Sequence, residues 1–199
     1  ACAPFRRLHL CNKNMENIKT NIIDNKHDLL LDVCMAAKYE GQSIKTHYPK
    51  YDAEYPSGSS FTTCTMLARS FADIGDIIRG KDLFIGYDKK DRARRKQLEE
   101  NLIEIFKQIH SGLTGGAKTH YEGDDPNYYK LRNAWWEANR QEIWKAITCD
   151  AWGNTYFRGT CGSGKTGTLT PSQCRCNDDQ VPTYFDYVPQ YLRWFEEWA

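Results

Sequence analysis

The sequence lacks any long apolar stretch. Its 199 residues contain no run of about 18 apolar residues, the length that a membrane-spanning helix requires. The N-terminus, ACAPFRRLHL, also lacks the charged start and apolar stretch of a secretory signal peptide. We therefore expect no direct membrane insertion of this chain, and we expect export and anchoring to be encoded elsewhere in a longer parent protein.

An excess of charge of one sign is also missing. The chain has 27 Lys and Arg against 26 Asp and Glu, which gives a formal net charge of +1. A nucleic-acid-binding domain normally presents a strong positive field. We therefore expect no nucleic-acid partner, and any binding of a polyanion must come from a local patch of basic residues.

Catalytic motifs are few. There is no G-x-S-x-G elbow, and the five histidines are scattered along the chain. Residues 159–166, GTCGSGKT, formally match the phosphate-loop pattern that ends in Lys165 and Thr166. That loop needs a buried strand before it and a helix after it, but DAWGNTYFR is polar and aromatic, and Gly167 and Pro171 interrupt the region where the helix should begin. We predict no enzyme activity and no cofactor; a nucleotide-dependent enzyme is the alternative.

Zinc-knuckle spacing is absent as well. The nearest pair of cysteines is C-x-C rather than C-x-x-C, so we expect no metal site. The even number of cysteines favours disulfides and an oxidising, extracellular location. A cysteine-free stretch over residues 65–148 separates two clusters, and we expect pairing within each cluster because each lies in a loop-rich segment. The first cluster is Cys2, Cys11, Cys34 and Cys64, and the second is Cys149, Cys161, Cys174 and Cys176.

The sequence does contain helical periodicity. Residues 27–40 predict a first helix that ends at Gly41, and the Tyr-, Pro-, Ser- and Gly-rich residues 42–60 predict a connector. Further helices are predicted over 63–79 (with Thr62 or Thr63 as N-cap and Gly80 as terminator), 91–111, 128–148 and from about 188 to the end; 81–90 and 149–182 are predicted loops. Five tryptophans at helical spacings are assigned to packing: Trp135, Trp136, Trp144, Trp194 and Trp198.

A basic run stands at the start of the 91–111 helix, where the helix dipole would favour acidic residues. It consists of Lys89, Lys90, Arg92, Arg94, Arg95 and Lys96, and a smaller group of Arg6, Arg7 and Lys13 could extend it. The first interpretation is a solvated helix end in which Arg95 and Lys96 pair with Glu99 and Glu100. The second is a binding site for sulfated glycans or another acidic cell-surface ligand.

Several segments together resemble one family. ACAPFRRLHLC, CTMLARSFADIGDIIRG, LRNAWWEANRQEIWKAITC and VPQYLRWFEEWA are similar to the alpha-class Duffy-binding-like domains of Plasmodium falciparum erythrocyte membrane protein 1. The resemblance spans residues 2–199. It implies an all-α, disulfide-stapled fold with long irregular loops, of which residues 1–60 form a loop-rich subdomain with one helix and 61–199 a helical-bundle subdomain, while the family's third subdomain is absent.

The resemblance also implies a function. It suggests a cell-adhesion module of a variant antigen on the extracellular face of the infected erythrocyte, as part of a larger membrane-anchored protein. Its implied partners are receptors on host erythrocytes or endothelium, heparan sulfate or blood-group glycans as in rosetting, and host antibodies. The alternative is structural support and antigenic cover for an adjacent receptor-binding domain.

Overall fold

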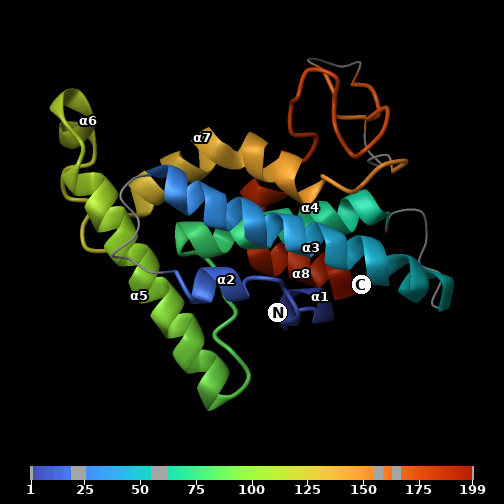
Figure 1. Ribbon diagram of the computed structural model, residues 1–199, viewed down its shortest axis with the longest axis horizontal. Coiled ribbons are helices and arrows are strands. Elements are labelled where there is room, and N and C mark those ends of the chain that lie inside the picture. Colours follow the sequence, from blue (N-terminus) through green and yellow to red (C-terminus); the bar gives the residue numbers. More distant parts are fainter. Residues whose placement is uncertain (1, 19–25, 55–61, 155–158, 163–166, 199) are drawn as a thin grey trace.

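Three long helices form the centre of the fold in the computed structural model, which describes residues 2–18, 26–54, 62–154, 159–162 and 167–198. Helices α3 (Lys26–Glu54), α4 (Thr63–Arg79) and α7 (Tyr129–Ile147) pack against one another in all three pairings (Figure 1). Every residue of α4 from Cys64 to Arg79 is buried. The bundle is therefore built around α4.

Shorter elements and one further long helix surround this bundle. Helix α5 (Lys89–Ser111) crosses one end of it and leads to α6 (Gly115–His120) (Figure 1). The chain begins with α1 (Phe5–Leu8) and α2 (Lys13–Glu16), and it closes with the 3-10 helix η1 (Phe185–Tyr187) and α8 (Gln190–Trp198). The described residues contain two isolated β-bridges and no strand, so the predicted all-α class is confirmed.

Helix boundaries from α4 onward follow the sequence closely. Thr62 caps α4, because its hydroxyl accepts a hydrogen bond from the Thr65 N–H, and Gly80 ends the helix in the left-handed conformation at φ 70°. Helices α5, α7 and α8 also lie where periodicity predicts them. Helix α6 and η1 were not predicted, because each spans two turns or fewer and carries no periodic signal.

The first predicted helix is wrong in length. Helix α3 continues through Gly41 and Pro49 to Glu54, across most of the predicted connector. Gly41 does not stop the helix; it allows a close approach, since a Cβ at this position would lie 2.0 Å from the carbonyl oxygen of Ile147 on α7. Gly41 is thus a contact point between two backbones.

The proposed division at residue 60 is not accompanied by a division of the core. The described part of residues 1–60 contains three helices, where the sequence predicts one. One continuous cluster of buried side chains joins Leu29 and Val33 of α3 to Phe71 of α4 and Trp144 of α7. Four of the five tryptophans assigned to packing are buried, whereas Trp198 is 61% exposed, so its assignment is wrong.

Helix α8 has its polar face inside and its apolar face outside. Gln190, Arg193 and Trp194 are buried against the bundle, and they meet charged groups there. The opposite face exposes four large apolar side chains: Tyr191, Leu192, Phe195 and Trp198. An exposed apolar surface of this kind usually marks a contact with another protein or with a membrane.

The disulfides correct the prediction of pairing within clusters. Cys64 is bonded to Cys174, which joins the two clusters, while Cys161 and Cys176 pair within the second cluster as expected. The cross-cluster bond forms because the segment after α7 folds back beside the start of α4, where the Trp144 indole donates to the Cys174 carbonyl at 3.1 Å. The other four cysteines are free thiols in this chain rather than bonded: Cys2, Cys11, Cys34 and Cys149.

Substitution of Gly41 tests the close approach of α3 and α7. Gly41→Ala should lower the free energy of unfolding by about 1–3 kcal/mol, because the methyl group collides with the Ile147 carbonyl. Gly116→Ala in α6 is the matched control: no atom lies within 4 Å of the position that its methyl group would occupy, so higher helix propensity should leave stability equal or slightly raised. Urea unfolding measures both, and equal effects would contradict the close-contact role.

Alkylation tests the thiol assignment. Burial raises the pKa of the Cys11 and Cys34 thiols to about 11, with Glu40 and Glu142 as the nearby carboxylates that add to it. Because the thiolate is the reactive form, iodoacetamide at pH 8 should label these two slowly and label the exposed Cys2 and Cys149 faster. Peptide mapping without reduction should recover the Cys64–Cys174 and Cys161–Cys176 links; a linked peptide containing Cys11 or Cys34 would refute the assignment.

Candidate functional site

The basic run occupies the first two turns of α5. Asp88 is the N-cap, and its carboxylate accepts the Asp91 N–H at 2.7 Å. The Asp91 side chain is buried in the first turn and pairs with Arg94 at 3.4 Å and Arg95 at 3.2 Å. Asp91 thus relieves the conflict between the basic residues and the helix dipole, and it neutralises two of the six cations.

The remaining cations are more accessible to a ligand. Lys89, Lys90 and Arg92 are exposed and form no ion pair with a carboxylate in the described part of the chain. Lys96 pairs with Glu100 at 3.7 Å, as the first interpretation predicts, but both side chains are exposed and such a pair is weak. Arg95 does not pair with Glu99, because Glu99 binds the buried Arg132 of α7 at 2.6 Å.

The segment over residues 81–88, predicted as a simple bridging loop, has alternating exposure. Asp82, Phe84 and Gly86 face the protein, while Leu83, Ile85 and Tyr87 are 55%, 70% and 67% exposed. We name these three exposed side chains the apolar row. The sequence signal that could have found it is the period of two in DLFIGY, which is typical of an extended segment with one solvent face.

A groove lies between this segment and α5. Its volume is about 490 Å³, and Phe84 and Ile85 line it together with Arg92, Arg95 and Lys96 of α5 and Tyr129 of α7. We name it the loop-helix groove. It places three members of the basic run beside apolar and aromatic surface, an arrangement suited to a ligand with an anionic group and an apolar part.

Arg6 and Arg7 do not extend the basic surface, which corrects that prediction. The Arg7 side chain is fully buried and pairs with Asp82, and Arg6 pairs with Asp73 at 2.7 Å and with Glu197 at 2.9 Å. Neither guanidinium can meet a ligand. Lys13, by contrast, is exposed on α2, which packs beside α5.

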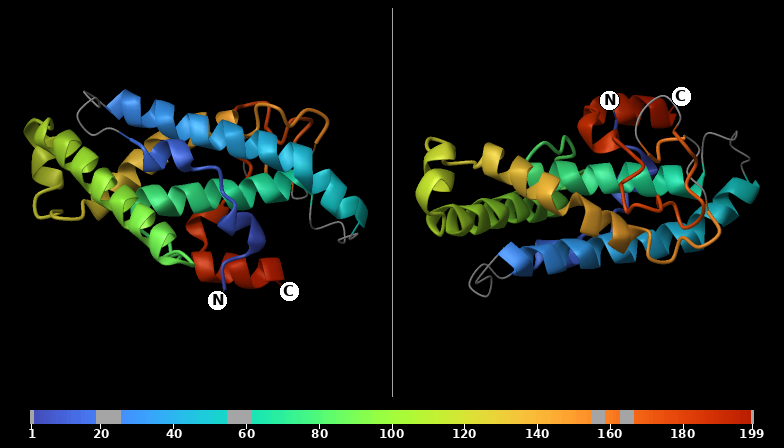
Figure 2. Two further views of the ribbon diagram at one scale, coloured as in Figure 1. Left: turned by 60° about the horizontal axis from the view of Figure 1, so that its bottom comes forward. Right: turned by 90° about the horizontal axis from the view of Figure 1, so that it is seen from above.

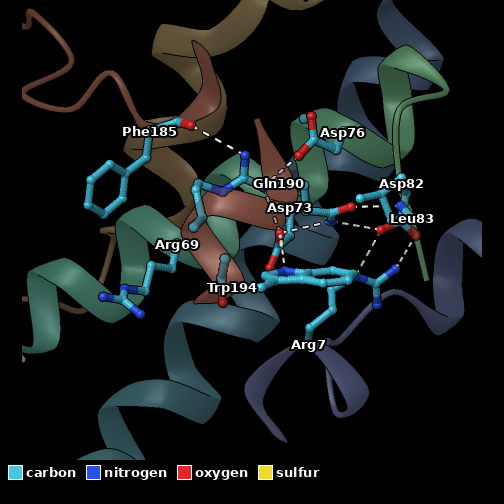
Figure 3. A network of polar contacts seen from close by, with 12 residues as sticks. Arg7, Arg69, Asp73, Asp76, Asp82, Leu83, Phe185, Gln190 and Trp194 are labelled. Atoms are coloured by element: carbon cyan, nitrogen blue, oxygen red, sulfur yellow. Dashed lines mark hydrogen bonds and ion pairs between the residues drawn. The ribbon is translucent and has the colours of Figure 1, made fainter. Parts of the chain in front are cut away.

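Asp73 is the centre of the buried charge network shown in Figure 3. Besides Arg6, its carboxylate accepts hydrogen bonds from Arg193 at 2.8 Å, Gln190 at 3.0 Å and the Trp194 indole at 3.3 Å. Burial alone would raise the pKa of Asp73, but Arg6, Arg193 and Arg7 hold it at about 2, with the Gln190 hydrogen bond adding to their effect. The carboxylate therefore stays charged inside the protein.

Other chemistries find little support in the described chain. None of its helices has the length and apolar character that crossing a bilayer requires. No group of three or more His, Cys, Asp or Glu side chains could hold a metal ion within the described residues. Lys165 and Thr166 of the phosphate-loop pattern lie outside those residues, but Cys161 within the pattern is in a disulfide, and the described residues 167–184 contain no helix.

Comparisons with known proteins give a consistent family. The Duffy binding domain family matches residues 1–193. The chain is 27% identical to the Duffy receptor beta form of Plasmodium knowlesi, over all of this chain but 14% of that protein. Among solved structures, the NTS-DBL1α domain of the Plasmodium falciparum membrane protein PfEMP1 from the varO strain is 46% identical with a TM-score of 0.81, over all of this chain and 43% of that one.

A second similar structure is that of a complex with another protein. A DBLβ domain of PfEMP1 bound to human ICAM-1 is 31% identical to this chain with a TM-score of 0.67, and the match covers 97% of this chain and 38% of that one. This chain therefore spans less than half of each of these relatives.

Replacing Asp73 tests the buried network through its pH dependence. At pH 7, Asp73→Asn should lower the free energy of unfolding by about 3–5 kcal/mol, because it leaves buried guanidinium groups without their carboxylate. A carboxyl whose folded pKa is lowered stabilises above its unfolded pKa of about 3.9, and this contribution is lost as the pH falls toward 2.

The difference in free energy of unfolding between the wild type and Asp73→Asn should therefore become smaller between pH 4 and pH 2. Urea unfolding at several pH values measures it. Asp150→Asn is the control, since Asp150 is partly exposed and takes part in no ion pair within the described residues. A deficit at pH 7 no larger than that of the control would refute the central role of Asp73.

Proposed function

Because this chain belongs to the Duffy binding domain family, and is an alpha-class Duffy-binding-like domain of PfEMP1, we propose that it is a cell-adhesion module that contacts host-cell receptors through the start of α5. The observation that carries the proposal is the set of three exposed cations without an ion pair in the described chain, Lys89, Lys90 and Arg92, of which Arg92 lines the loop-helix groove. Domains of this protein are extracellular parts of a larger parasite surface protein, and a related DBLβ domain binds ICAM-1. The proposed location is the outer face of the infected erythrocyte.

The proposed ligand chemistry is a sulfated glycan of the heparan sulfate type. Sulfate groups would meet Lys89, Lys90 and Arg92, which have no competing carboxylate in the described chain. Binding would be sensitive to salt, because exposed charges are screened over about 10 Å at 0.1 M ionic strength. A net charge of only +1 makes this a local interaction, in contrast to the chain-wide field of a nucleic-acid-binding protein.

The apolar row adds a second type of contact. Leu83, Ile85 and Tyr87 stand directly before the basic run, so one surface combines apolar side chains with cations. Interfaces between proteins draw most of their energy from a few buried aromatic and apolar side chains, while charges at the edge set the rate and orientation of approach. The same surface would therefore suit a protein receptor with acidic residues around an apolar centre.

The alternative function is support and antigenic cover for an adjacent receptor-binding domain. The exposed apolar face of α8 favours it, since Leu192, Phe195 and Trp198 present the kind of surface that packs against another domain. In that case a tandem protein would bind host cells and the isolated chain would not. Both functions leave the surface loops exposed to host antibodies, and neither involves catalysis.

Charge neutralisation tests the proposed glycan site. Changing Lys89, Lys90, Arg92 and Lys96 to Gln should abolish retention on immobilised heparin, since each basic group near an anionic surface contributes about 1 kcal/mol and four together about a thousandfold in affinity. The melting temperature should not change, because these side chains are exposed. Salt elution from the heparin column and thermal unfolding provide the two measurements.

The matched control changes four exposed lysines elsewhere, Lys38, Lys107, Lys118 and Lys130, to Gln. It alters the net charge equally, so it separates a local site from a general charge effect. Equal loss of retention in both variants would refute the site, and retention of neither wild type nor variant by heparin would leave the support function as the better account.

A further inference from the structure

One side of the loop-helix groove is an extended segment that is not held by hydrogen bonds between backbone groups. Residues 82–87 form no hydrogen bond from their backbone to the backbone of another described residue. The conformation of this segment therefore depends on side chains from elsewhere in the chain. Arg92 of the neighbouring α5 donates to the Gly86 carbonyl at 3.4 Å, and the side chains that hold residues 82 and 83 come from the two ends of the chain, Arg7 of α1 and Gln190 of α8 (Figure 3).

Gln190 of α8 makes two contacts with this segment and a third with Asp73 of α4. Its side-chain oxygen accepts the Leu83 N–H at 2.7 Å, and its amide nitrogen donates to Asp82 at 2.8 Å and to Asp73 at 3.0 Å. Only a side-chain amide offers an acceptor and two donors together in this geometry. A glutamate here would keep the acceptor and set a third carboxylate against two others, so the position is specific for the amide.

Arg7 of α1 contacts two residues of the same segment, Asp82 and Phe84. Its guanidinium pairs with Asp82, and it also lies over the Phe84 ring at 5.1 Å. Arg95 of the basic run lies over the same ring at 4.2 Å. Phe84 thus contacts a guanidinium from the buried network and one from the groove, and its position links the two.

The two ends of the chain are themselves held together. They lie side by side in both views of Figure 2, and the Trp198 indole donates to the Cys2 carbonyl at 3.0 Å. Arg6 and Glu197 add an ion pair between α1 and α8. Displacing either terminal helix therefore removes support from residues 82–84 through the contacts described above.

We propose that Gln190 and Arg7 are positioning residues for the loop-helix groove, through which contacts made at the two chain ends regulate ligand binding at the start of α5. The regulatory part rests on the proposed adhesion function. In this arrangement, a neighbouring domain that displaces α8 or α1 loosens the groove wall and weakens binding, and one that holds them in place strengthens it. Neither residue is among those that line the groove.

Hydrogen exchange of the whole chain tests positioning without any ligand. In Gln190→Ala, the amide of Leu83 should exchange about tenfold faster, because its N–H loses the Gln190 acceptor while Asp82 loses a donor. Amides of α7 report on global unfolding, which loss of the Gln190 bond to Asp73 also affects, so their exchange should rise by less than that of Leu83. Gln141→Ala is the matched control: its amide makes one exposed contact, to the Asp179 carbonyl, and it should leave 82–87 unchanged.

A second variant tests the same role in case Gln190→Ala does not fold. Arg7→Lys keeps a cation beside Asp82 but loses the flat guanidinium over Phe84. The Leu83 amide should therefore again exchange faster than in the wild type, by a smaller factor than in Gln190→Ala. Unchanged exchange of the Leu83 amide in both variants, or an increase equal to that of the α7 amides, would overturn the positioning role.

Heparin retention of the same variants tests the regulatory part. Gln190→Ala and Arg7→Lys should elute at lower salt than wild type while Gln141→Ala elutes with it. Faster exchange with unchanged elution would overturn regulation of the groove. If wild type is not retained at all, the proposed glycan function fails, and the exchange result alone decides whether Gln190 and Arg7 position the wall.

Discussion

The charge of Asp73 is the constraint from which the arrangement of this domain follows. The carboxylate lies on α4, the helix that is buried along its length, and burying a charge is costly unless cations and hydrogen-bond donors surround it. Those partners come from the two ends of the chain: Arg6 from α1, and Arg193, Gln190 and Trp194 from α8. The bundle is therefore complete only when both terminal helices are docked. This is also why α8 turns its polar side inward and leaves its apolar side outside.

Local electrostatics explain how a nearly neutral domain can present a cationic surface. Asp91 forms ion pairs with Arg94 and Arg95, and Glu99 forms one with Arg132, so these carboxylates near the start of α5 are already paired. Lys89, Lys90 and Arg92 then face solvent without a carboxylate partner in the described chain. The net charge of +1 hides this separation, because arginines and carboxylates buried around Asp73 contribute to the count and not to the surface.

Features that depend on a few neighbouring residues could be predicted from the sequence, whereas features that depend on packing between distant segments could not. Thr62, Gly80 and the apolar stripes of α4, α5 and α7 were sufficient to predict these helices, because caps and periodicity are properties of a few neighbouring residues. Gly41 has the same local appearance as a helix stop, but its role is set by the Ile147 backbone of another helix. Arg6 and Arg7 have the pattern of surface cations until Asp73 and Asp82 are brought beside them. The bond between Cys64 and Cys174 likewise depends on a fold-back that no spacing reveals. The functional prediction came from family resemblance, and the basic run alone would have left it open.

The bond between Cys64 and Cys174 joins two residues 110 positions apart in the sequence and closes a loop that includes α5, α6 and α7. Any single proteolytic cut between these cysteines leaves one covalent molecule, because both new ends stay attached through the sulfur atoms. The exposed turns around α6 and the segment that carries the basic run all lie inside this closed loop. A single cut in this loop thus leaves the basic run covalently attached to the rest of the domain.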